Sequence, residues 1–375
     1  MSTACIHHRI ITTLIALFVY PGTIVAQDGQ APERELSMQQ LDVLRKLREA
    51  GAVIENSAGV WVATLYDGNE LYVPREDGSN EKKEQPKWSG SIEQLRMLED
   101  LPIHTVHIMR KTLTDAELTA ITELKATKKL VLHLGHADVS SDSLKGIGRM
   151  ANLVELFVQS PSVNEEFLDK ISTLGKLESL GFSNCSLTAD GVRKLHRLPM
   201  LVSLNIGWTQ LDEDTLAAIA EFENLRQLKL NKIELSGISA LDLRGLTSLD
   251  SLSLTHATIS DEWVHEIGQL RRLTLINFYG TELTDGQFEL LFPALIKKND
   301  AGNRLVTLYL DRTRISDETV DLIRATESMR YANAFVVLPA TVTEDAAKSL
   351  FETNPAWQIV HYQMIGGKPV ASQIK

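Results

Sequence analysis

A hydrophobic pattern that recurs every 24 residues constrains this chain more than any other feature of its sequence. It has the form L-x-x-L-x-L and first appears clearly at residues 153–158. It recurs at residues 177–182, 201–206, 225–230, 249–254 and 273–278 and, after a spacing of 32, at 305–310. Alternating apolar residues in short runs predict strands with one buried face. The fixed spacing predicts a stack of units that bury one another's apolar faces.

Each strand pattern is followed by signals for a turn and a helix. An aliphatic residue lies ten positions after the first leucine, and a helix-capping residue type comes next. These predicted caps are Asn164, Thr188, Asp212, Ser236, Ser260, Thr284 and Ser316. Their side-chain oxygens can accept a backbone N–H from the first helical turn. Apolar residues then return at helical spacing, so each unit is predicted to be a strand, a turn and a short helix.

Weaker copies of the unit extend the array to about ten units. They lie at residues 105–118, 130–144, 334–347 and 357–362. In the second of these, Lys129 occupies the position of the leading leucine. The 32-residue spacing comes from an insertion at residues 292–303, which lengthens one connection from helix to strand. The predicted fold class is therefore α/β, an open solenoid with a parallel concave sheet and outer helices.

The repeat resembles that of leucine-rich repeat proteins, whose strand signature is L-x-x-L-x-L-x-x-N/C. It is most similar to the helix-bearing, ribonuclease-inhibitor-like type found in exported bacterial proteins. The resemblance covers residues 101–362 and implies a horseshoe that binds partners on its concave face. One departure is clear, because the N/C position holds no asparagine. It holds Pro161, Cys185, Thr209, Ile233, Ala257, Thr281 and Thr313.

The first 26 residues predict an export signal. One arginine, Arg9, precedes an apolar run at residues 10–20, and the small residue Ala26 ends the segment. This run is shorter than the roughly 20 residues that a membrane span needs, and no later segment is long and apolar enough. We therefore expect a periplasmic, cell-surface or secreted protein. With Cys5 inside the signal, Cys185 would remain alone, so no internal disulfide is expected.

The rest of the chain divides into a cap, the repeats and a tail. Residues 27–100 predict a disordered lead-in and an N-terminal cap that shields the first open unit. Within the cap we expect helices at residues 38–50 and 91–100, strands at 52–55 and 60–66, and a loop at 72–87. The repeat domain spans residues 101–362, and residues 363–375 are expected to form a loose tail.

The net charge of −11 argues against a nucleic-acid partner, because phosphate binding needs clustered Lys and Arg. There is no phosphate-binding loop, no G-x-S-x-G, no H-E-x-x-H and no Cys-x-x-Cys. The sequence therefore predicts neither an enzyme nor a cofactor.

Three places nevertheless carry metal-ligand or nucleophile residue types. The stretch I-S-D-E-W-V-H-E-I at residues 259–267 contains a Glu-x-x-His pair, but in register these side chains fall on a solvated helix face. Cys185 is expected to be a buried structural thiol. His107 and His133 are predicted to occupy the same outward position on adjacent strands, with His136 and Glu155 nearby, as a weak zinc or copper candidate.

The outward strand positions form the predicted partner-binding face. Trp, Tyr and Arg are the residue types that most often anchor interfaces. The candidate contact residues are Phe157, Asn205, Trp208, Lys229, Asn277, Tyr279, Tyr309 and Arg312. The sequence thus predicts a non-catalytic scaffold that binds a protein or peptide outside the cytoplasm. The alternatives are a metal-binding protein that uses the two histidines and a structural component of the cell envelope.

Overall fold

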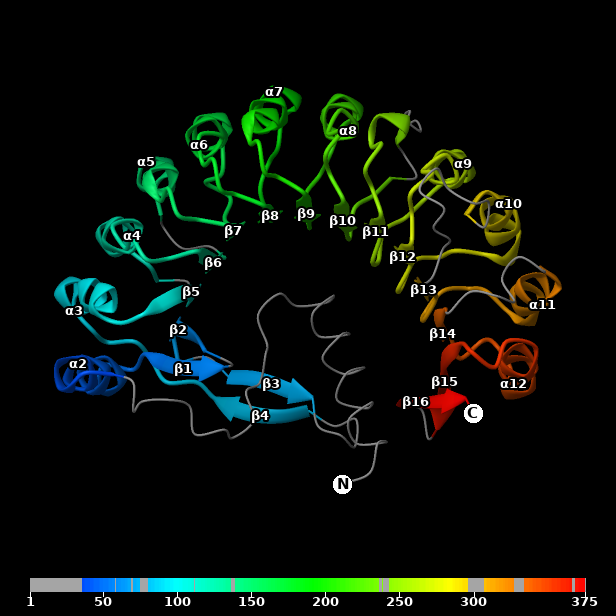
Figure 1. The fold of residues 1–375 in the computed structure, drawn as a ribbon, viewed down its shortest axis with the longest axis horizontal. Helices are drawn as coiled ribbons and strands as arrows, with labels where there is room; N and C mark the ends of the chain where they lie inside the picture. Colours follow the sequence, from blue (N-terminus) through cyan, green and yellow to red (C-terminus); the bar gives the residue numbers. More distant parts are fainter. Residues whose placement is uncertain are drawn as a thin grey trace.

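The strands of the protein line the inside of an arc and the helices lie on its outside (Figure 1). This computed structural model describes residues 36–57, 59–68, 70–74, 80–110, 112–135, 139–235, 238, 243–295, 307–326, 334–365 and 368–374. The main sheet has 14 strands, in the order β1-β2-β5-β6-β7-β8-β9-β10-β11-β12-β13-β14-β15-β16. Neighbouring strands from β2 to β15 pair in parallel, whereas β1 and β16 pair antiparallel at the two ends.

The strands are short, and most belong to one repeat each. Their bounds are β1 Val53–Ser57, β2 Val60–Tyr66, β5 Ile103–Met109, β6 Lys129–His133, β7 Glu155–Gln159, β8 Ser179–Ser183, β9 Ser203–Gly207, β10 Gln227–Asn231, β11 Ser251–Ser253, β12 Leu275–Asn277, β13 Thr307–Tyr309, β14 Phe335–Leu338, β15 Gln358–Ile365 and β16 Lys368–Ile374. A separate hairpin pairs β3 (Glu70–Pro74) with β4 (Asn80–Glu84).

The helices are equally short. Their bounds are α2 Met38–Glu49, α3 Ile92–Arg96, α4 Asp115–Thr122, α5 Ser141–Lys145, α6 Glu165–Ile171, α7 Ala189–Lys194, α8 Glu213–Ala220, α9 Asp261–Ile267, α10 Asp285–Leu295, α11 Asp317–Ala325 and α12 Glu344–Thr353. Short 3-10 turns occur at Met97–Asp100, Gly146–Arg149, Leu195–Arg197 and Leu243–Gly245. The insertion at residues 292–303 begins inside α10, and its residues beyond 295 lie outside the described chain.

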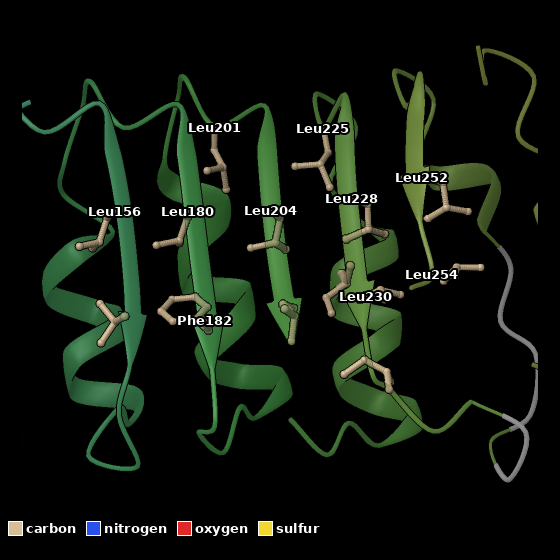
Figure 2. Packing of buried hydrophobic residues seen from close by; sticks show 14 of the residues in the cluster. Leu156, Leu180, Phe182, Leu201, Leu204, Leu225, Leu228, Leu230, Leu252 and Leu254 are labelled. Carbon is tan, nitrogen blue, oxygen red and sulfur yellow. The ribbon is translucent and has the colours of Figure 1, made fainter. Parts of the chain in front are cut away.

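Leucines of successive strands form a continuous ladder inside the arc. Leu156, Leu180, Leu204 and Leu228 pair in register, and each is at most 3% exposed. Figure 2 shows these side chains pointing from the sheet toward the helices. Complete burial of a leucine side chain stabilises the fold by about 1.5–3 kcal/mol. The predicted repeat and its core are therefore confirmed.

The predicted helix caps are confirmed with one exception among the described ones. Asn164, Thr188, Asp212, Thr284 and Ser316 each accept a backbone N–H with a side-chain oxygen. Ser260 has the extended backbone of a cap residue, but its side chain accepts no helix N–H. Ser236 lies outside the described residues.

The N-terminal cap contains the predicted helix α2, closed by a capping box between Ser37 and Gln40. A largely buried ion cluster joins this cap to the first repeat. Arg110, which is 7% exposed, donates to Asp67 at 3.2 Å and to Glu117 at 2.6 Å. Asp67 follows β2 in the cap, and Glu117 lies on α4 in the first repeat. The cluster therefore fixes the cap against the repeats.

Two predicted irregular segments are strands instead. Residues 72–87, expected to be a loop, contribute to the β3–β4 hairpin. Residues 363–375, expected to be a loose tail, complete β15 and form β16, which pairs with β15 from Ile359 to Ile365. The antiparallel partner supplies hydrogen bonds to the last parallel strand and so covers an otherwise open edge. Within the described chain, no helix is long and apolar enough to cross a membrane. The predicted export signal lies outside it.

Candidate partner-binding face

The concave face is made of outward side chains whose register the strand pairing defines. The middle outward row runs through Phe157, Gly181, Asn205, Lys229, Ser253, Asn277 and Tyr309. This confirms the predicted register of five of the candidate contact residues. Tyr279 follows β12 two positions beyond Asn277, and Trp208 and Arg312 lie just past the ends of strands.

The N-terminal end of this row is apolar, whereas its centre is polar. At the N-terminal end the Phe157 ring lies over Gly181, where an added Cβ would approach the ring within 2.6 Å. Gly181 therefore leaves the space that the phenylalanine ring needs. In the centre, the Asn231 amide donates to Asn205 and accepts from the Ser253 hydroxyl, at 3.3 and 3.5 Å.

Asn277 has a structural role in the fold. It is 3% exposed, and its side-chain oxygen accepts the backbone N–H of Tyr279 at 2.8 Å. The Lys229 side chain is half-buried, and this burial, followed by the charge of Lys129, lowers its pKa. Polar side chains in the centre of the face are therefore already engaged with one another or with the backbone.

A row of residues with positive φ follows the carboxyl ends of the strands, and we call it the ridge. It consists of Asn184, Trp208, Lys232, His256, Gly280 and Arg312, with φ between 54° and 69°. The backbone N–H of each of the first five donates to a carbonyl of the next unit. This left-handed conformation costs a non-glycine residue about 1–2 kcal/mol. Trp, Lys and Arg are unusual in it, and such outliers cluster at functional sites.

The first aromatic group on the ridge is Trp208. Its side chain is 62% exposed, and the Lys232 ammonium lies 3.6 Å from the ring centroid. A cation over an indole face is attracted by the ring's quadrupole, with about 0.5–1 kcal/mol at an exposed site. The pair therefore presents a flat apolar surface and a positive charge side by side.

The second group on the ridge surrounds Tyr279. The His256 ring meets it edge to face at 5.2 Å, and the Arg312 guanidinium lies 5.3 Å from its centroid. Gly280 is required here, because an added Cβ would lie 2.3 Å from the His256 ring. Burial, and then the charges of Lys232 and Arg312, lower the pKa of His256. Three cationic or titratable side chains are thus gathered along this edge.

One carboxylate lies beside this group. Asp311 is 6% exposed, and burial raises its pKa to about 6, although Arg312 acts in the opposite direction. Tyr362 packs against the cluster of Tyr309, Val337 and Val360, and burial, followed by Asp311 and Tyr279, raises its pKa to about 12. Tyr309 is 8% exposed and packs its ring 5.5 Å from that of Phe335.

The predicted pairing of His107 with His133 is wrong. His107 lies opposite Val131, and His133 lies opposite Gln159, because the second and third repeats are 26 residues apart instead of 24. Thr127, which is 2% exposed, occupies the place of the leading leucine, and the prediction that Lys129 occupies it is wrong. Because of this two-residue offset, Val131 occupies the middle outward row beside Phe157, and His133 lies at the next outward position along the strand.

The surroundings of His107 and His133 differ from those of a metal site. His133 is hydrogen-bonded to Gln159 at 2.9 Å and packs 5.0 Å from the Phe157 ring. Burial, with smaller effects of Lys129 and His133, lowers the pKa of His107 to about 4. No group of three or more His, Cys, Asp or Glu side chains in the described ranges is placed to hold a metal ion, and His136 lies outside those ranges.

The other two candidates from the sequence are the Glu-x-x-His pair on α9 and the thiol of Cys185, and neither lies in a reactive setting. On α9, Val264 and Ile267 are buried while Glu262 and His265 face solvent, as predicted. Trp263 is also buried, and its indole N–H donates to the Ile238 carbonyl at 3.0 Å. The Cys185 thiol is partly buried beside Thr209, and burial raises its pKa to about 11, so its reactive thiolate form is disfavoured.

Sequence reasoning missed Lys232, His256 and Asp311 as site residues. The signal for the first two was present, since Trp208, Lys232, His256 and Gly280 follow one another at 24 residues and Arg312 comes 32 later. What the pattern did not indicate was the positive φ that places these side chains in one row.

A parallel sheet that lines the inside of an arc, built from L-x-x-L-x-L units with helices outside, defines a leucine-rich repeat solenoid. No protein-family model matches the chain, and no curated protein matches it. The ribonuclease-inhibitor-like subtype stays a prediction.

The solved structures that are similar to this chain include an internalin and a plant peptide hormone receptor. An internalin (InlF) from Listeria monocytogenes has a TM-score of 0.43 at 19% identity, over 69% of this chain and 74% of the internalin chain. The plant peptide hormone receptor RGFR1, in complex with RGF2, has a TM-score of 0.35 at 19% identity. That similarity covers 72% of this chain and 42% of the receptor. At these TM-scores the fold assignment rests on the repeat architecture itself.

Proposed function

We propose that this protein is a non-catalytic scaffold that binds a protein or peptide through its concave face outside the cytoplasm. The observation that carries this proposal is the ridge. Its large side chains are held in a backbone conformation that costs energy, and the fold itself gains little from Trp208, which is 62% exposed. Exposed tryptophan together with tyrosine and arginine is typical of the anchors of protein interfaces.

The exported location rests on the N-terminal sequence. Arg9, the apolar run at residues 10–20 and Ala26 have the order of a cleavable signal. N-terminal sequencing of the protein from an exporting host tests this part. A first residue near position 27 supports export, and an intact N-terminus inside the cytoplasm contradicts it.

The binding role is tested by affinity capture from the extracytoplasmic fraction of the source cells, with three forms of the protein. The first is the unchanged chain. The second carries Trp208→Ala with Tyr279→Ala on the concave side. The matched control carries Glu262→Ala with His265→Ala on the solvated face of α9. We expect a partner that is captured by the first and third forms and lost from the second. Equal capture by all three forms would contradict binding through the concave face.

A further inference from the structure

The charge of the ridge differs from that of the whole molecule. The chain has a net charge of −11, yet the ridge carries Lys232, His256 and, beyond Gly280, Arg312. Across the described ranges, no salt bridge joins any of these three to a carboxylate. By contrast, the neighbouring Arg314 is paired with Glu282 at 2.7 Å. The cationic side chains of Lys232 and Arg312 are therefore available to an anion from outside.

The rings of Trp208, on the ridge, and of Tyr279, beside it, restrict the positions of these side chains. Lys232 lies over the Trp208 ring, Arg312 lies over the Tyr279 ring, and the His256 ring meets the Tyr279 ring edge to face. Because a side chain held in this way loses less rotamer freedom on binding, an ion pair that it forms is less costly. The rings also give apolar side chains of a partner a surface to pack against.

The carboxylate of Asp311 opposes this only in part. Asp311 is largely buried below the ridge, and its pKa is raised by burial to about 6. It therefore carries its full negative charge only above about that pH. Glu234, the other acidic side chain close to Lys232 in sequence, accepts a hydrogen bond from Thr258.

We propose that the ridge binds an extended acidic segment of a partner protein, with its carboxylates paired to Lys232 and Arg312 and hydrogen-bonded to His256. Apolar side chains of the same segment would pack against Trp208 and Tyr279. This inference rests on the proposed function and names the chemistry of the partner. An acidic segment is favoured because the charges of the ridge are complementary to it, while the negative remainder of the chain would repel it elsewhere.

The dimensions of the ridge fit a short peptide. Adjacent strands lie about 4.8 Å apart, so the four steps from the unit of Trp208 to that of Arg312 span about 19 Å. An extended chain advances about 3.3 Å per residue. About six residues are therefore enough to cover the ridge from end to end.

Fluorescence anisotropy with a labelled hexaglutamate peptide tests the proposal directly on the full chain. At low ionic strength we expect saturable binding that weakens as salt is added, because exposed charges are screened. Arg312→Ala should weaken this binding at least 5-fold, and Lys232→Ala should have a similar effect. The matched control is Arg314→Ala, which removes the same charge from the chain but leaves the ridge intact, and it should bind like the unchanged protein.

The pH dependence adds a second readout. Between pH 7.5 and 5.5 the surroundings of the ridge become less negative, since Asp311, whose pKa is about 6, gains a proton while glutamate side chains stay mostly ionised. We therefore expect tighter binding of hexaglutamate at pH 5.5.

Three results would overturn the inference. They are preferential binding of hexalysine, equal loss of binding in Arg314→Ala and Arg312→Ala, and tighter binding of a six-nucleotide oligothymidine than of hexaglutamate. Absence of hexaglutamate binding at low salt would also overturn it. None of these results affects the capture experiment with the Trp208 and Tyr279 variants, so failure of this inference and failure of the scaffold function are distinguishable.

Discussion

The inward face of the main sheet repeats one residue type from unit to unit, whereas its outward face does not. Inward positions such as Leu180 and Leu204 repeat one residue type and are at most 1% exposed. Outward positions at the same strands hold Gly181 and Asn205, and the ridge beyond them changes from Trp208 to Lys232 to His256. The inward side chains must fill identical spaces between stacked units. The outward ones do not fill a space that repeats from unit to unit, so their residue types can differ along the sheet even where, as at Gly181, a neighbouring side chain restricts them.

The largest effect is expected on the inward face. Leu204→Ala removes a fully buried side chain from the middle of the ladder and leaves a cavity that the short neighbouring strands cannot close. We expect a loss of about 2–5 kcal/mol in the free energy of unfolding, measured by urea denaturation. A loss below 1 kcal/mol would mean that the ladder does not carry the stability of the stack.

A smaller effect, of opposite sign, is expected at Asp311. Its folded-state pKa is about 6, above the ordinary value of 3.8, so its contribution to stability is fully present below about pH 4 and is lost as pH rises through about 6. Asp311→Asn should therefore raise the free energy of unfolding at pH 7.5, on the order of 1 kcal/mol.

Urea denaturation at pH 5 and pH 7.5 measures this difference. The variant should also lose part of the decline in stability between these two values. A variant that is less stable than the unchanged chain at pH 7.5 would show that the Asp311 carboxylate is stabilised by its surroundings.

The smallest effect is expected on the ridge itself. In Trp208→Gly, relief of about 1–2 kcal/mol of backbone strain is offset by the extra entropy that a glycine loses on folding, about 0.5–1 kcal/mol, and by the lost contact with Lys232, worth about 0.5–1 kcal/mol. The free energy of unfolding should stay within about 0.5 kcal/mol of the unchanged chain. Asn184→Gly, at an equivalent position without an aromatic ring, is the control. A loss as large as that of Leu204→Ala would place the ridge within the folding framework and remove the contrast between the two faces.

Much of the fold could be predicted because it depends on local periodicity. The strand repeat and the caps at Asn164 and Asp212 follow from residue types at fixed spacing. The pairing of His107 with His133 failed because two extra residues precede the third repeat. A shift of two keeps a side chain on the same face of a strand, so both histidines are still outward, but it changes their neighbours.

The sequence by itself determined the repeat, the inward ladder and the side of the sheet that each residue faces, because these depend only on spacing along the chain. The tertiary structure decided which outward residues meet. It placed Arg312 and His256 against Tyr279, buried Asp311 beside them, and paired β16 with β15. These contacts depend on backbone φ and on burial between distant units, and no local pattern encodes either.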